Sequence, residues 1–296
     1  MSMKITALVG VKDEVELIDA CVRHLRSIGV GQIIVFDVGS TDGTIERLQE
    51  HAGLPDLKYF VIDDRQADAM QRANQIYREV LGGSDADWVI FLDADEFWIP
   101  ATGDLRVCAE RAQADVLSVR RFNVPVTASG ALLPDALQPS RYGELQLFVK
   151  KVPNLRARLK DEEDSMAWIR GVPRPKAMAR RRMIAGVAQG GHDVITPPNV
   201  DASRCCPLDL LIAHVPFTTS MRFARKLGNI GEYFRQRDAE GKGEEARAWH
   251  WRRWNELSDE AAMQAEFDQQ LFSDRRIGKL RERGVIRSAA EMLLVR

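Results

Sequence analysis

One apolar stretch that ends abruptly in acids constrains the fold more than any other part of the chain. Residues 88–92 read Trp-Val-Ile-Phe-Leu and are followed by Asp93, Asp95 and Glu96. A short apolar run bounded by charges is typical of a buried strand. In open α/β sheets, ligands bind beyond the carboxyl ends of the strands. We therefore interpret the run as a core strand that delivers carboxylates to a site.

The spacing of the two aspartates points to a metal. If the extended backbone continues through Asp93 and Asp95, both side chains lie on one side and can share a divalent cation. Carboxylates held close together repel unless a cation or protons neutralise them. The alternative is that an Asp-x-Asp sequence only solvates the end of a strand. The position directly after an apolar strand favours the metal interpretation.

Strand and helix patterns alternate up to this run. The predicted strands are Ile5 to Val11, Gln32 to Phe36 and Leu57 to Ile62, and predicted helices follow over residues 13–28, from Thr44, and over 66–81. This alternation predicts an α/β fold, with a mostly parallel sheet flanked by helices.

The second half of the chain has a looser pattern. We expect a helix over 104–113, strands over 116–126, 145–149 and 208–215, loops over 152–182, a helix over 219–236, and charged helices from Glu244 onward. The predicted division is a catalytic domain over 1–218 and a helical C-terminal extension over 219–296.

The composition limits the classes of partner. The 296 residues contain 42 Lys and Arg against 43 Asp and Glu, so the charge balance does not indicate a nucleic-acid binder. No apolar run is long enough to cross a bilayer, and the first residues do not resemble a signal peptide. The four cysteines lack C-x-x-C spacing. We expect reduced thiols in a cytoplasmic protein.

Four separate stretches resemble one family. They are Val11 to Glu14 after the first strand, Phe36 to Thr44 after the second, Phe91 to Phe97, and His214 to Ser220 with Phe223 and Lys226. Together they resemble a GT-A-fold glycosyltransferase of the family 2 type, in its family-92-like subgroup. The resemblance implies a GT-A-like, Rossmann-type sheet and a hexosyltransferase active in polysaccharide biosynthesis.

The resemblance also implies substrates and a cofactor. The donor would be a nucleotide sugar, with UDP as the expected nucleotide, and the acceptor a hydroxyl of a glycan, a lipid-linked saccharide or another molecule. Mn²⁺ or Mg²⁺ would neutralise the departing diphosphate. Asp93, Asp95 and His214 are the expected metal ligands, with Asp93 on the ribose or on the metal through water. The alternative for His214 is a partly buried histidine bonded to a loop.

The expected nucleotide-binding residues follow the first three strands and a late helix. They are Lys12, Glu14, Asp37, Asp42, Arg65, Asp93 and Lys226. Asp42 is equally suited to capping the following helix, and Arg65 to a surface pair with Asp63 or Asp64. Arg222 could reach the diphosphate together with Lys226, although basic residues on a helix usually face solvent.

The chain departs from the family at two points. Many family members carry paired aspartates where this sequence has Asp37 and Val38, and no residue clearly matches the usual general base. The expected catalytic residues are Asp95, Glu96, His192 and Asp193, with the last three as candidate bases that take the acceptor's proton.

The tryptophans have two interpretations each. Trp98 and Trp168 could stack on a sugar ring or pack in the core. Trp251 and Trp254, beside Arg252 and Arg253, fit either helix packing or a peripheral contact with the inner face of a membrane.

Two other functions fit the same acidic strand end. A metal-dependent nucleotidyltransferase or phosphohydrolase would release pyrophosphate or phosphate in place of a nucleoside diphosphate. A non-catalytic protein that only binds sugar nucleotides would also retain these motifs.

Overall fold

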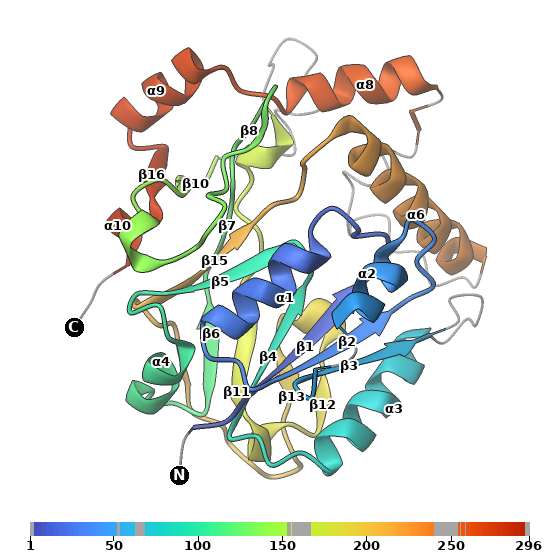
Figure 1. The fold of residues 1–296 in the computed structure, drawn as a ribbon, viewed down its shortest axis with the longest axis vertical. Helices are drawn as coiled ribbons and strands as arrows, with labels where there is room; N and C mark the ends of the chain where they lie inside the picture. Colours follow the sequence, from blue (N-terminus) through green and yellow to red (C-terminus); the bar gives the residue numbers. More distant parts are fainter. Residues whose placement is uncertain are drawn as a thin grey trace.

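A seven-stranded sheet forms the centre of the computed structural model, which describes residues 3–51, 54–62, 69–152, 155, 167–239, 254, 256–257 and 259–293 (Figure 1). The strand order is β14 (Arg204–Cys205), β6 (Val116–Val119), β11 (Lys176–Arg180), β4 (Trp88–Asp93), β1 (Ile5–Val11), β2 (Gln32–Asp37) and β3 (Leu57–Val61). Strands β4, β1, β2 and β3 are parallel, and β11 is antiparallel to both of its neighbours. The predicted α/β fold is confirmed.

Helices cover both faces of this sheet because its strands are apolar on both sides. On one face Ala7, Val9 and Ile90 pack with α1 (Ile18–Ser27), α2 (Thr44–His51) and α4 (Leu105–Arg111). On the other face Leu8 and Phe91 pack with α3 (Ala69–Gly82) and the hairpin of β12 (Gly186–Val187) and β13 (Val194–Ile195). Alternate residues of each strand thus belong to two separate cores.

A second, three-stranded sheet continues from the end of the first. Its central strand β15 (Leu210–His214) is antiparallel to β5 (Glu96–Pro100) and parallel to β7 (Arg121–Asn123). The register places His214 between Glu96 and Asn123. This sheet brings the acids after β4 beside the histidine predicted from the late strand.

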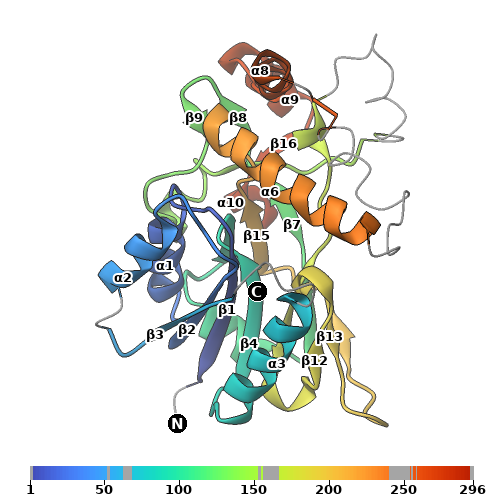
Figure 2. The same cartoon turned by 90° about the vertical axis from the view of Figure 1, so that its right-hand side faces the viewer.

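The C-terminal part is mainly helical, as predicted. It contains α6 (Ser220–Ala239), α8 (Glu260–Gln269), α9 (Asp274–Glu282) and α10 (Ala289–Met292). Figures 1 and 2 show α8 and α9 at the end of the molecule remote from the N-terminus. A strand that was not predicted, β16 (Ile286–Ser288), pairs with β10 (Gln146–Phe148), while β8 (Val126–Thr127) and β9 (Gly130–Ala131) form a hairpin.

Three element predictions were wrong. The predicted single strand over 116–126 is divided into β6, β7 and β8, which lie in three different sheets. The expected loop over 152–182 contains β11 inside the central sheet. The first predicted helix begins at Ile18, because residues 14–17 form a turn after Asp13, whose φ is 54°. In the described part of the chain, no helix is both long and apolar enough to span a membrane.

Candidate functional site

The carboxyl ends of β1 and β4 open onto a cavity of about 880 Å³. Seven predicted site residues line it: Lys12, Glu14, Asp93, Asp95, His192, His214 and Lys226. Asp37, Asp42, Glu96 and Asp193 are described but do not line it, and Arg65 lies outside the described residues. The cavity is where an open α/β sheet is expected to bind its ligand.

The two aspartates of the Asp-x-Asp sequence have different surroundings. The chain turns at residues 94 and 95, so the extended backbone assumed for a shared cation does not continue through them. The Asp93 side chain is half-exposed and accepts a hydrogen bond from Lys176 Nζ at 2.8 Å. Asp95 is buried and points into a separate cluster with His214.

The two carboxylate oxygens of Asp95 have different hydrogen-bond partners. Its Oδ2 accepts hydrogen bonds from Lys226 and, at 3.2 Å, from Arg222. Its Oδ1 is buried and has no hydrogen-bond partner among the described residues. Burial opposes ionisation, but the charges of Lys226 and Arg222 outweigh it and hold the pKa of Asp95 well below its usual range. A charged oxygen is thus left available to a ligand.

His214 presents a lone pair beside this carboxylate. Asn123 Nδ2 donates to the carbonyls of Ile169 and Gly171, so its Oδ1 accepts from His214 Nδ1 at 2.6 Å. The remaining nitrogen, Nε2, lies 3.6 Å from Asp95 Oδ2. Burial lowers the pKa of His214 to about 4, so the ring is neutral at neutral pH. A neutral histidine whose other nitrogen is bonded to a side chain is the usual form of a metal ligand.

Glu96 belongs to a group of three possible metal ligands, but both of its oxygens are already paired with cationic side chains. Oxygen and nitrogen atoms of Asp95, Glu96 and His214 all lie within 4.8 Å of one another. However, Arg121 pairs with one oxygen of Glu96, and Lys176 Nζ lies 3.1 Å from the other. The same second oxygen accepts from the Asp93 backbone N–H. The Asp95 carboxylate and His214 Nε2 therefore fit a divalent cation, whereas both oxygens of Glu96 are paired with cations of the chain.

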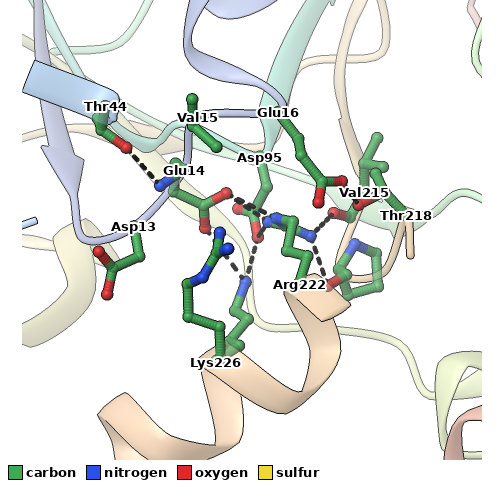
Figure 3. Close-up of polar contacts among 12 residues, drawn as sticks. Asp13, Glu14, Val15, Glu16, Thr44, Asp95, Val215, Thr218, Arg222 and Lys226 are labelled. Atoms are coloured by element: carbon green, nitrogen blue, oxygen red, sulfur yellow. Dashed lines mark hydrogen bonds and ion pairs between the residues drawn. The ribbon is translucent and has the colours of Figure 1, made fainter. Parts of the chain in front are cut away.

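Arg222 holds the acids against helix α6 (Figure 3). It is buried, and it donates to Glu14 Oε2 at 2.6 and 2.8 Å, to Asp95, and to the carbonyls of Val215 and Pro216. Its side chain does not line the cavity, so Arg222 is placed to fasten the site and not to contact a diphosphate. Lys226, one turn further along α6, does line it.

The turns after β1 and β2 are held mainly by their own acids. Asp37 is buried and accepts from the Ser40 backbone N–H at 2.8 Å, and burial raises its pKa. Asp42 accepts from the backbone N–H of Thr44 at 3.0 Å and from Arg225 at 2.9 Å. Asp42 therefore caps the first backbone N–H of α2 with its side chain, in agreement with its alternative interpretation.

The candidate bases are not equivalent. Asp193 pairs with Arg204 at 2.6 Å on the surface, away from the cavity. His192 lines the cavity, and its Nδ1 lies 2.7 Å from the Pro175 carbonyl oxygen, which leaves Nε2 as the proton acceptor. Burial lowers the pKa of His192 to about 4, and the charges of Lys176, Arg121 and Arg174 add to this effect.

The tryptophans singled out in the sequence lie in different surroundings. Trp98 lies in the core, and Trp168 lines the cavity while it contacts Phe217 and Trp254. Trp254 is buried among these rings, which supports helix packing, and Trp251 lies outside the described residues.

Sequence reasoning missed three polar residues of this site. Asn123 and Arg121 lie on β7 and Lys176 on β11. Their partners are distant in sequence: His214 for Asn123, Glu96 for Arg121, and Asp93 and Glu96 for Lys176. Their only signal was a polar residue inside a predicted strand or loop, which is common at surfaces.

Comparisons with known proteins give one family model and several solved structures. Residues 6–148, just under half of the chain, match the model of glycosyl transferase family 2. No curated protein matches the chain.

Several solved structures are similar at low identity. TarS (residues 1–349) of S. aureus in complex with UDP has a TM-score of 0.33 and 18% identity over 41% of this chain and 36% of that chain. The same protein in complex with UDP-GlcNAc has a TM-score of 0.37 and 13% identity, over 69% of this chain and 58% of that chain. Glucosyl-3-phosphoglycerate synthase of Mycobacterium tuberculosis with Mn²⁺, UDP and glucosyl-3-phosphoglycerate has a TM-score of 0.33 and 18% identity over 65% and 62%.

The chain thus spans less than two thirds of each of these structures. The family-92-like subgroup stays a prediction. Residues 6–148, from β1 to β10, are therefore similar to glycosyl transferase family 2.

Proposed function

We propose that the chain transfers a sugar, of hexosyl type, from a nucleoside diphosphate donor to a hydroxyl acceptor, with UDP as the nucleotide. The observation that carries this proposal is the position of Asp95 and His214 at the wall of the cavity. Asp95 keeps Oδ1 without a hydrogen-bond partner among the described residues, and His214 Nε2 lies 3.6 Å from Asp95 Oδ2. The family match over residues 6–148 supports the reaction class.

Asp95 and His214 would hold the divalent cation. Mn²⁺ and Mg²⁺ both accept oxygen ligands and commonly contact substrate phosphates, and Mn²⁺ more readily accepts a histidine nitrogen. When bound, the cation supplies Lewis-acid stabilisation of the departing diphosphate. Asp93, which we had expected to share the cation, is paired with Lys176 and is better placed to accept a hydrogen bond from a ribose.

The chain's own residues would supply binding and proton transfer. Lys12, which donates to the Gly39 carbonyl at 3.3 Å, and Val38 would border the nucleoside at the ends of β1 and β2. Lys226 would add positive charge beside the diphosphate. His192 would take the proton of the acceptor hydroxyl on Nε2, since it alone among the three candidate bases lines the cavity.

The domain division at residue 218 and the wider setting also remain proposals. Helix α6 belongs to the predicted extension, yet its Arg222 and Lys226 reach the acids of the predicted catalytic domain. A role in polysaccharide synthesis at the inner face of a membrane is a proposal from the sequence, as are the cytoplasmic location and a glycan or lipid-linked acceptor.

Calorimetric titration tests the donor site. UDP, GDP and their common sugar conjugates would be titrated with and without Mn²⁺ into the unmodified protein, His214→Gln and, as a surface control, Arg47→Gln. We expect Mn²⁺-dependent binding of a UDP compound to be lost in His214→Gln and retained in the control. Absence of nucleotide binding in every condition would refute the proposal.

The base is tested separately. His192→Gln should bind UDP and Mn²⁺ normally but lose release of UDP from the donor sugar nucleotide. Unchanged turnover would exclude His192 as the base. Formation of pyrophosphate or phosphate in place of UDP would favour a nucleotidyltransferase or phosphohydrolase, and binding without turnover in the unmodified protein would favour a binding protein.

A further inference from the structure

The acids of the site are already matched by cations of the chain. Glu14, Asp93, Asp95 and Glu96 are four carboxylates in mutual proximity. Four cationic side chains pair with them: Arg121, Lys176, Arg222 and Lys226. This cluster therefore presents no excess negative charge to the cavity.

Two further cations line the same cavity. Lys151 and Arg174 are exposed, and no acid among the described residues pairs with either of them. Their neighbours in the chain, Val152 and Pro173, also line the cavity. Within the described part of the chain, no acid compensates the charges of Lys151 and Arg174.

Arg174 lies beside the candidate base. It precedes Pro175, whose carbonyl oxygen is bonded to His192 Nδ1, and its charge acts on the His192 ring. The nucleoside is expected at the other part of the cavity, where β1 and β2 end with Lys12 and Val38. Arg174 thus lies near the place where an acceptor hydroxyl would meet its base, and Lys151 lines the same cavity.

The proposed donor does not compensate the positive charges of Lys151 and Arg174. In the proposed reaction, the divalent cation offsets the charge of the donor's diphosphate. A substrate that covers Lys151 and Arg174 removes them from water, which costs free energy unless the substrate brings an opposite charge. We propose that the acceptor of this enzyme is anionic and carries a phosphate or carboxylate group that Lys151 and Arg174 bind. This inference rests on the proposed function.

Matched sugars test the charge requirement. Glucose 6-phosphate, glucuronate and glucose share one scaffold and differ in the anionic group, so the first two distinguish a phosphate from a carboxylate. Each would be titrated calorimetrically into protein preloaded with UDP and Mn²⁺, so that the donor's phosphate site is occupied. We expect at least one anionic sugar to bind at least tenfold more tightly than glucose, and this preference to weaken with added salt.

Two variants connect the preference to the residues. The double variant Lys151→Gln/Arg174→Gln should lose at least tenfold in affinity for the anionic sugar, whereas Lys58→Gln, at an exposed position on β3, should lose none. Equal binding of all three sugars, or full affinity in the double variant, would overturn the inference while UDP binding stood. If the double variant weakens UDP binding, the cations serve the donor and the inference is wrong. Failure of UDP to bind the unmodified protein would refute the proposed function and this inference together.

Discussion

Replacing Arg222 with methionine should destabilise the protein strongly. The guanidinium group is buried and directs its N–H groups at Glu14, Asp95 and two backbone carbonyls. Methionine fills a similar volume but donates no hydrogen bond and carries no charge. Glu14 would keep only the more distant Lys226, whose Nζ lies 3.7 Å from its Oε1.

The size of the effect follows from the partners left behind. Removing one member of a buried ion pair costs about 3–5 kcal/mol, because the other charge stays buried without compensation. Two carboxylates lose a partner here, but Lys226 still compensates Asp95 directly. We therefore expect a loss of about 3–4 kcal/mol in the free energy of unfolding at pH 7.

The loss should depend on pH in a defined direction. Burial already raises the pKa of Glu14, and the charges of Lys226 and Arg222 oppose that rise. Without Arg222 the pKa rises further, so the folded variant binds a proton more readily than the unfolded chain does. The penalty should therefore be largest at neutral pH and shrink as the pH falls toward the unfolded-state value near 4.3.

Urea unfolding of the metal-free protein at pH 7 and pH 5 measures both effects. The double variant Glu14→Gln/Arg222→Met also removes the uncompensated charge of Glu14, so it should recover part of the lost free energy of unfolding. The control Arg47→Met, in an exposed ion pair, should cost about 0.5 kcal/mol or less. A loss of under about 1 kcal/mol, an equal loss at both pH values, or no recovery in the double variant would refute the reasoning.

Two further substitutions test the site and its support. Asn123→Leu should lower Mn²⁺ affinity roughly 10- to 100-fold, because no side chain then fixes the tautomer of His214. Asn123→Asp keeps a hydrogen-bond acceptor and should lose less affinity. Equal affinity of the unmodified protein and both variants in a Mn²⁺ titration would contradict this role. Gly191→Ala should cost roughly 1–3 kcal/mol in thermal or urea unfolding, since φ is +65° and a Cβ would lie 2.6 Å from Phe91 Cβ. Gly143→Ala, with open space around it, is the matched control, and an equal cost at both positions would show that the contact with Phe91 is unimportant.

The first half of the fold could be predicted because its signals are local. Strands β1, β2 and β4 are continuous apolar runs, and the turn after β2 contains its own capping residue, Asp42. Each of these features depends on neighbours within a few residues. The boundaries predicted for β1 and for the start of α2 agree with the structure.

The second half could not be predicted because its charges are neutralised at long range. Strand β11 begins with Lys176, which the sequence presents as a charged residue in a segment rich in prolines and arginines. Its ammonium group is buried only because Asp93 and Glu96, some eighty residues earlier, pair with it. Likewise the run over 116–126 has one continuous pattern, and only the pairing of β7 with β15 shows that it leaves the central sheet after β6.

The two oxygens of Asp95 have different surroundings, which the Asp-x-Asp motif alone could not predict. One oxygen accepts hydrogen bonds from Arg222 and Lys226 of α6 and lies 3.6 Å from His214 Nε2, and the other has no hydrogen-bond partner among the described residues. A substitution of Asp95 would therefore alter both the support of α6 and the binding of a cation, and a loss of activity would not separate them. His214 is bonded to Asn123 and makes no hydrogen bond to either α6 cation, so its substitution removes a ligand atom while the contacts of Arg222 stay in place. For this reason the histidine, and not the aspartate, is the residue on which the metal proposal is best judged.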